Sequence, residues 1–215
     1  MKMEENHKIN DEEMKVEFAV NLKVKNKSFK KYDIVSKFRY ANLIPLKILS
    51  IISEGYAICT SNICRNKNDY CYLNNKNFIS CQIIALDCDN SYKGKEGPLM
   101  FGKDKYFSFE DAKKDEFLIK NSSFIHTTFN HTDEWNRFRV FFILEEAITD
   151  TAYIKDLTTA LIFKYNTDKA ASSVTQQFFG SLDCEYEYFG KFLTKEVQKE
   201  IIAENGTPNE PFILF

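Results

Sequence analysis

The chain of 215 residues has little glycine and proline, with 7 and 4 of them. This scarcity excludes a low-complexity or linker-dominated protein. Long apolar runs are also missing, so no transmembrane helix is expected. The first eleven residues are polar and of mixed charge, without the apolar core of a signal peptide. We therefore expect a cytoplasmic protein that has no membrane partner.

A large excess of either charge is missing too, since the net charge is −2 at pH 7. A broadly basic nucleic-acid coat is excluded, and any nucleic-acid contact must use a local patch. Such a patch is available between residues 23 and 39, where seven basic residues accompany one acid, Asp33. This run is either a solvated face or a surface for phosphate backbones, and the sequence leaves both open.

Aromatic side chains are abundant, with 20 Phe and 11 Tyr, so a sizeable core can form. We expect a flexible segment over residues 1–14 and one domain over 15–215, either a standalone enzyme or a fragment of a longer protein. Six cysteines are scattered, and four of them precede the first acidic motif: Cys59, Cys64, Cys71 and Cys81. Their spacing lacks a C-x-x-C pair, so we expect free thiols and no zinc site.

Hydrophobic periodicity predicts helices at 43–55, 108–114, 149–165 and 191–203. It predicts strands at 16–24, 56–59, 78–86, 123–128 and 137–144, with loops at 62–77 and 91–102. The last two strands flank a polar turn at 130–136, which suggests a hairpin rather than a crossover. The pattern favours an α+β fold, with helices packed on a mostly antiparallel sheet.

The strand predicted at 78–86 runs into Asp87-Cys88-Asp89-Asn90. Side chains alternate along a strand, so Asp87 and Asp89 should share a face and Cys88 should pack on the opposite one. Adjacent carboxylates repel each other unless a cation lies between them. Mg²⁺ or Mn²⁺ would suit such oxygen ligands, although a D-x-D is also typical of a strand that enters an Asp/Asn turn.

Two later segments carry further polar side chains. His131 lies at the turn after the 123–128 strand, and Arg137 and Arg139 alternate on the next strand, so they share a face. Guanidinium groups beside an imidazole suit polyphosphate oxygens, but exposed charges on an edge strand can also serve only against aggregation. Asp168 follows a predicted helix and is either a third acid or a turn residue.

In order, these segments are an apolar strand with D-x-D-N, then T-x-x-H-T with R-F-R-V-x-F, then an Asp followed by Q-x-F-x-G. This order resembles the catalytic domain of the archaeo-eukaryotic primase (AEP) superfamily, as found in primase-polymerases of phage and plasmid replication. The resemblance implies an RRM-like antiparallel catalytic sheet joined to a smaller N-terminal α/β module. It also implies two divalent metals on Asp87, Asp89 and Asp168. The nucleotide would lie against Thr128, His131, Arg137 and Arg139.

The resemblance therefore implies a template-dependent nucleotidyltransferase that joins NTPs or dNTPs on single-stranded DNA, with a helicase domain or protein as a further partner. Two metals would activate the 3′-hydroxyl and stabilise the leaving pyrophosphate. The pattern departs from the family at Asn130, where relatives have a small hydroxyl residue before the histidine. Two alternatives stay open: an inactive nucleic-acid-binding replication module and a two-metal nuclease.

Overall fold

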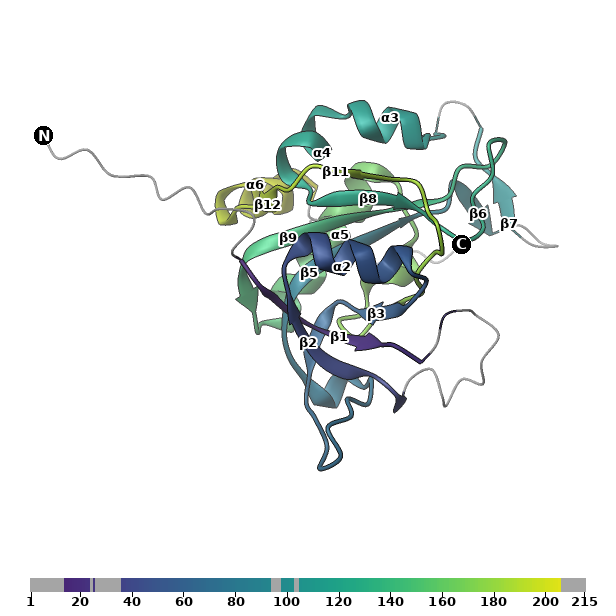
Figure 1. The fold of residues 1–215 in the computed structure, drawn as a ribbon. Helices are drawn as coiled ribbons and strands as arrows, with labels where there is room; N and C mark the ends of the chain where they lie inside the picture. Colours follow the sequence, from purple (N-terminus) through teal and green to yellow (C-terminus); the bar gives the residue numbers. More distant parts are fainter. Residues whose placement is uncertain (1–13, 24, 26–35, 94–97, 103–104, 206–215) are drawn as a thin grey trace, which may run out of the picture.

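The computed structural model describes residues 14–23, 25, 36–93, 98–102 and 105–205 (Figure 1). The segment predicted to be flexible lies outside the described residues except for Met14. So do three members of the basic run, Lys27, Lys30 and Lys31. No helix in these ranges is long and apolar enough to cross a membrane.

A mostly antiparallel sheet forms the centre of the molecule. Its strands lie in the order β11 (Tyr186–Tyr188), β8 (Phe124–Thr127), β9 (Phe138–Ile148), β5 (Phe78–Cys88) and β4 (Ser61–Ile63). The short strand β12 (Phe192–Leu193) pairs in parallel with β9. Strands β8 and β9 form the antiparallel pair predicted from the sequence, and β5 pairs with β9 along most of its length.

A second, smaller sheet contains β10 (Gln177–Phe178), β3 (Ala57–Cys59), β1 (Val16–Asn21) and β2 (Arg39–Leu43), in that order. It carries the helix α2 (Pro45–Ser53), which begins with a proline at its first position and ends before Gly55 at φ +88°. This unit is the smaller α/β module expected at the N-terminus. One of its strands, β10, nevertheless comes from the last quarter of the chain.

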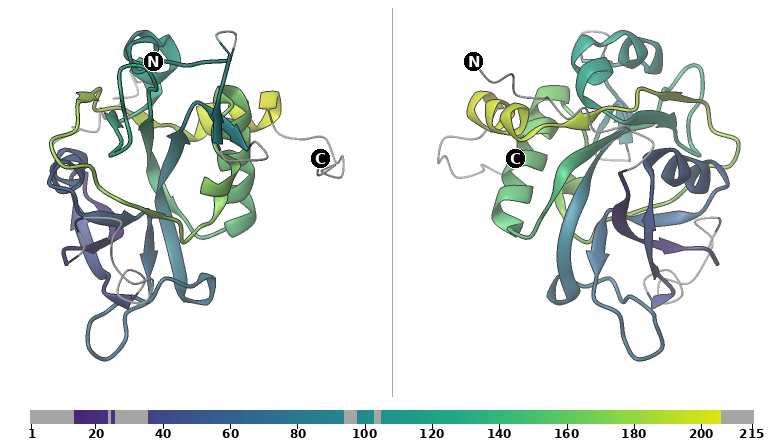
Figure 2. Two further views of the ribbon diagram at one scale, coloured as in Figure 1. Left: turned by 90° about the vertical axis from the view of Figure 1, so that its right-hand side faces the viewer. Right: turned by 60° about the vertical axis from the view of Figure 1, so that its left-hand side comes forward.

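The two faces of the central sheet bury two different cores. Ile84, Leu86 and Cys88 face a core shared with the helices, and these helices are α3 (Phe109–Lys114), α4 (Glu116–Asn121), α5 (Thr151–Tyr165) and α6 (Lys195–Asn205). Ile83 and Ala85 face the opposite core, which β1 and α2 complete. The left view of Figure 2 shows these layers, with the small sheet, the long strands and the late helices in succession. The predicted α+β class is confirmed.

Several elements differ from the sequence-based expectation. The segments predicted as loops contain β4, the 3₁₀ turn η1 (Asn75–Asn77), and a hairpin of β6 (Ser91–Lys93) with β7 (Pro98–Met100). Strand β2, helix α4, the strands after residue 176 and the 3₁₀ turn η2 (Lys169–Ser172) were also not predicted. Most of these elements are short, so hydrophobic periodicity has few residues from which to emerge.

Candidate active site

The two aspartates of the D-x-D lie where strand β5 ends. Residue Cys88 points into the core beside the helices, which confirms the alternation predicted from the sequence. Asp87 pairs in register with Arg139 of β9, and Arg139 pairs in register with His126 of β8. Opposed residues on antiparallel strands share a face. Asp87 and Arg139 therefore project together toward the small sheet.

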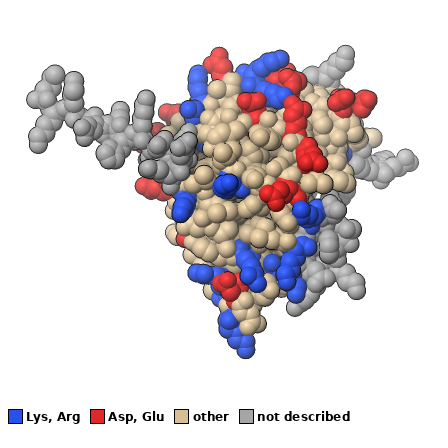
Figure 3. All heavy atoms as spheres, viewed as in Figure 1, with Lys and Arg blue, Asp and Glu red and all other residues tan. Residues whose placement is uncertain are grey.

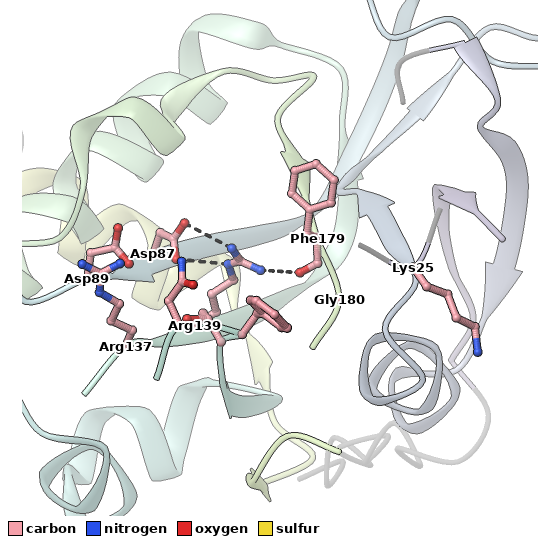
Figure 4. Close-up of a pocket in the computed structure, with 10 residues that line it drawn as sticks. Lys25, Asp87, Asp89, Arg137, Arg139, Phe179 and Gly180 are labelled. Atoms are coloured by element: carbon pink, nitrogen blue, oxygen red, sulfur yellow. Dashed lines mark hydrogen bonds and ion pairs between the residues drawn. The ribbon is translucent and has the colours of Figure 1, made fainter. Parts of the chain in front are cut away.

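Arg139 holds the Asp87 carboxylate with two nitrogens. Nε lies 3.1 Å from Oδ1 and Nη2 lies 3.4 Å from Oδ2, while Nη1 donates to the carbonyl oxygen of Phe179 at 2.6 Å. The side chains of Arg139 and Asp87 are only 12% and 22% exposed. A fork of this kind fixes the orientation of both groups. It also ties the central sheet to the segment that follows β10 (Figure 4).

A cavity of about 430 Å³ opens beside this pair. Its lining combines two acids of the predicted site, Asp87 and Asp89, with its two arginines. Residues from three other segments complete the lining. The lining residues are Lys25, Asp87, Asp89, Thr128, Phe129, Asn130, Arg137, Arg139, Phe179 and Gly180. Figure 4 shows Asp87 and Asp89 next to each other, with Arg139 between Asp87 and Phe179.

The electrostatics of the cavity favour a cation at Asp89. Burial raises the pKa of this carboxyl, and the charges of Asp87 and Asp168 raise it further. Arg137 and Arg139 act in the opposite direction, but they do not cancel the shift. An acid whose charged form is disfavoured by burial and by neighbouring acids gains from a bound positive charge. The carboxylate pair therefore fits a hard divalent cation such as Mg²⁺ or Mn²⁺.

Asp168 reaches the same region through its backbone. It follows α5, which is capped by Asn166 with φ +50°, and its N–H donates to the Asp87 carbonyl at 3.1 Å. Its side chain is exposed and does not line the cavity. Within the described part of the chain, no three His, Cys, Asp or Glu side chains are arranged to hold one ion. The structure therefore brings Asp168 near the aspartate pair without completing a three-carboxylate clamp.

His131 is part of a turn that positions Arg137. Its Nδ1 lies 3.1 Å from the Arg137 nitrogen and 3.2 Å from the Arg137 oxygen. That oxygen already accepts the Thr128 N–H at 2.8 Å, so we assign Nδ1 as the acceptor of the Arg137 N–H. A neutral ring then carries its proton on Nε2. His131 does not line the cavity, whereas Thr128 and Arg137 do.

Trp135 supports the same turn from the other side. Its indole Nε1 donates to the Asp89 carbonyl at 2.9 Å, and the Arg137 guanidinium stacks 4.3 Å from its ring centroid. The Nε of Arg137 is buried without a hydrogen-bond partner among the described residues. The Arg137 guanidinium is therefore held by stacking on Trp135. Its Nε still has a hydrogen bond to donate.

Asn90 joins three segments beneath the acids. Its side-chain amide donates to the carbonyls of Phe107 and Asn136, both at 2.8 Å, and its oxygen accepts the Phe107 N–H at 2.9 Å. It is only 5% exposed and has φ +49°, a conformation that Asn tolerates better than most residues. Asn90 thus has a structural role beside the D-x-D.

Sequence reasoning missed Lys25, Phe129, Phe179 and Gly180 as residues of the cavity. Phe129 and Gly180 stand inside segments that the motifs had already marked, so proximity in sequence was a usable signal. For Lys25, the only signal in the sequence was that it belongs to the basic run. The role of Phe179 depends on its backbone carbonyl, which sequence patterns do not reveal.

These features describe an α+β protein whose acid and arginine side chains meet in one cavity between two sheets. No protein-family model matches the chain, and no curated protein matches it. Among solved structures, it is similar to the AEP domain of the cyanophage S-2L primase-polymerase (PrimPol). That similarity has a TM-score of 0.46 and 10% sequence identity, and it covers 90% of each chain.

Proposed function

We propose that the chain is a metal-dependent, template-directed nucleotidyltransferase of the primase-polymerase kind. One observation carries the proposal: two carboxylates at the end of β5 and two arginines at the start of the adjacent β9 line the same cavity. Such a site offers oxygen ligands to a cation and guanidinium groups to a polyphosphate. A nucleoside triphosphate bound with its metal ion requires both.

Asp87 and Asp89 would hold the cation, with Asp168 as a third ligand from its neighbouring segment. A bound divalent ion would supply Lewis-acid activation of a 3′-hydroxyl and would stabilise the pyrophosphate that leaves. The raised pKa of Asp89 supports this assignment, because burial and the charge of Asp87 disfavour its charged form and a bound cation would offset both. Asp168 would have to turn its side chain toward the pair.

The two arginines would have different roles. All three nitrogens of the Arg139 guanidinium already contact Asp87 or the Phe179 carbonyl. We infer that Arg139 positions Asp87. Arg137 stacks on Trp135 and keeps a buried Nε without a partner among the described residues, so it is the better phosphate ligand. The proton on His131 Nε2 would add a donor behind it.

The test is extension of a primed single-stranded template with NTPs or dNTPs and Mn²⁺. Asp87→Asn and Asp89→Asn should each lower the rate by about 100-fold or more, because a charged ligand is removed without loss of volume. Asp156→Asn, on the exposed side of α5, is the matched control and should leave the rate unchanged. Full activity in both site variants would refute the proposal.

Measurements of KM and kcat distinguish the proposed roles of Arg137 and Arg139. Arg137→Gln should raise KM for the nucleotide if it binds the triphosphate in the ground state, whereas Arg139→Gln should mainly lower kcat. Equal effects of both variants on KM alone would contradict the division of roles.

One observation favours a second candidate, a nucleic-acid-binding module without activity. No three metal-type side chains converge among the described residues, and two carboxylates are fewer than such an enzyme normally uses. Template binding by the wild-type chain without binding of Mn²⁺ or nucleotide would support this candidate. Degradation of labelled DNA without added nucleotide would instead indicate a nuclease.

A further inference from the structure

A group of cations and tyrosines lies at β2 and in the loop after β4, outside the cavity. We call it the tyrosine–arginine surface and define it by Lys37, Arg39, Tyr40, Arg65 and Tyr70. The Arg39 guanidinium lies 5.0 Å from the Tyr70 ring centroid, and its Nη2 donates to the Tyr70 hydroxyl at 3.3 Å. Lys37 lies 6.0 Å from the same ring, and Arg65 lies 4.6 Å from the ring of Tyr40.

The backbone fixes these side chains relative to one another. The loop after β4 returns to the start of β2, where the Cys71 N–H donates to the Phe38 carbonyl at 2.9 Å. Cys71 also bridges Arg65 within the loop, and its own side chain is buried in a small core with Phe38. The rings and cations are therefore attached to a packed element, which limits the entropy lost when a ligand binds.

Cations outnumber acids on this surface, where Glu17 accepts a hydrogen bond from the Tyr40 hydroxyl at 2.7 Å. Figure 3 shows Lys and Arg side chains gathered over the lower part of the molecule, where Figure 1 places β1, β2 and the loop after β4. The acid Asp69 contacts Arg65 at 3.6 Å, but both side chains are more than half exposed, so the pair contributes little. The hydrogen bond from Arg39 and the charge of Lys23 lower the pKa of Tyr70, which agrees with a positive local potential.

The basic run also reaches the cavity. Lys25 lines it, and its ammonium group lies 4.4 Å from the ring centroid of Tyr56, in the segment that enters β3. Lys23, two residues earlier, acts electrostatically on Tyr70. Cations are therefore present from the tyrosine–arginine surface to the mouth of the cavity.

We propose that the tyrosine–arginine surface binds single-stranded nucleic acid, with backbone phosphates on the cations and a base stacked against Tyr70. Aromatic rings interleaved with cations are what a flexible single strand requires, because every base has a face that can stack. An acidic peptide would use the cations but would leave the rings without a role. That the strand leads into the cavity as a template rests on the proposed function, but the binding itself does not.

The experiment measures fluorescence anisotropy of a labelled oligothymidylate over a salt series, in EDTA and without nucleotide. The triple variant Lys37→Gln/Arg39→Gln/Arg65→Gln should lower the slope of log affinity against log salt by about 2, since each phosphate contact contributes roughly 0.7. The matched control neutralises three exposed lysines on or near α5 and α6 as Lys155→Gln/Lys191→Gln/Lys199→Gln. It should keep the wild-type slope.

Stacking is tested separately. Tyr70→Leu should weaken binding by about tenfold, whereas Tyr70→Phe keeps the ring and should bind within about twofold of wild type. Circular dichroism of each variant checks that the fold is retained. Equal slopes for the two triple variants, or no binding by the wild type, would overturn the inference. Binding with the expected slope change in a chain that extends no primer would uphold it while refuting the proposed function.

Discussion

Asn90 should be the most sensitive single position beside the acids. Its side chain makes three hydrogen bonds from a buried position, to the Phe107 carbonyl and N–H and to the Asn136 carbonyl. Asn90→Ala removes all three, at about 1 kcal/mol each. An alanine at φ +49° adds about 1 kcal/mol of backbone strain. We therefore expect unfolding free energy to fall by about 4 kcal/mol.

Two further variants separate these contributions. Asn90→Gly loses the same hydrogen bonds but tolerates the positive φ, so it should cost about 3 kcal/mol. Asn68→Ala, in an exposed loop, is the matched control and should change stability by less than about 0.5 kcal/mol.

The assay is urea unfolding followed by tryptophan fluorescence. Trp135 is the only tryptophan of the chain, and its indole donates to the Asp89 carbonyl. The same signal therefore reports on global unfolding and on the D-x-D turn, and a red-shifted native emission would indicate a loosened turn. The reasoning fails if Asn90→Ala unfolds at the wild-type urea concentration.

Two other positions test the surroundings of the cavity. His126 is fully buried, and burial followed by the charge of Arg139 lowers its pKa to about 3. Because the unfolded chain takes up this proton below about pH 6.5, stability should fall by about 2 kcal/mol from pH 7.5 to pH 5. His126→Phe should remove that loss in urea unfolding at the two pH values, and an unchanged loss would contradict the assignment. Gly180→Ala would place a Cβ 2.4 Å from the Gly55 carbonyl carbon and 2.5 Å from the Tyr56 oxygen, so we expect about 1–3 kcal/mol of destabilisation and weaker nucleotide binding in a titration. Wild-type stability and wild-type nucleotide binding in Gly180→Ala would show that the backbone at Gly180 can move away from Gly55 and Tyr56 without cost.

Sequence patterns predicted the structure correctly where the pattern lay within a single strand or hairpin. The apolar run before Asp87 predicted β5, and the strand pair around the polar turn predicted the hairpin of β8 and β9. Strand alternation also placed Cys88 in the core and both aspartates on the other face. In each case the periodicity of a long element decides which way a side chain points.

Long-range pairing was beyond such reasoning. Strand β10 has two residues and joins the small sheet only because it pairs with β3. That pairing brings Phe179 and Gly180 to the cavity, at least 90 residues after the D-x-D. No local pattern encodes the contact of Arg139 with a backbone carbonyl. The expected joint role of Arg137 and Arg139 followed from their alternation, but the difference between their partners required the structure.

Three adjacent strands determine how charge is distributed in the cavity. Asp87, Arg139 and His126 form one register row across β5, β9 and β8. His126 stays neutral because it is buried, so it adds no second cation to this row, and Arg139 forms its ion pair with Asp87. This pair is nearly self-compensating. Asp89, Arg137 and Lys25 are then the other charges that line the cavity. Under the proposed function, Asp89 would bind the cation and Arg137 would bind a phosphate. The proposed metal–triphosphate ligand would supply both opposite charges at once, which would account for the presence of both residues in one cavity.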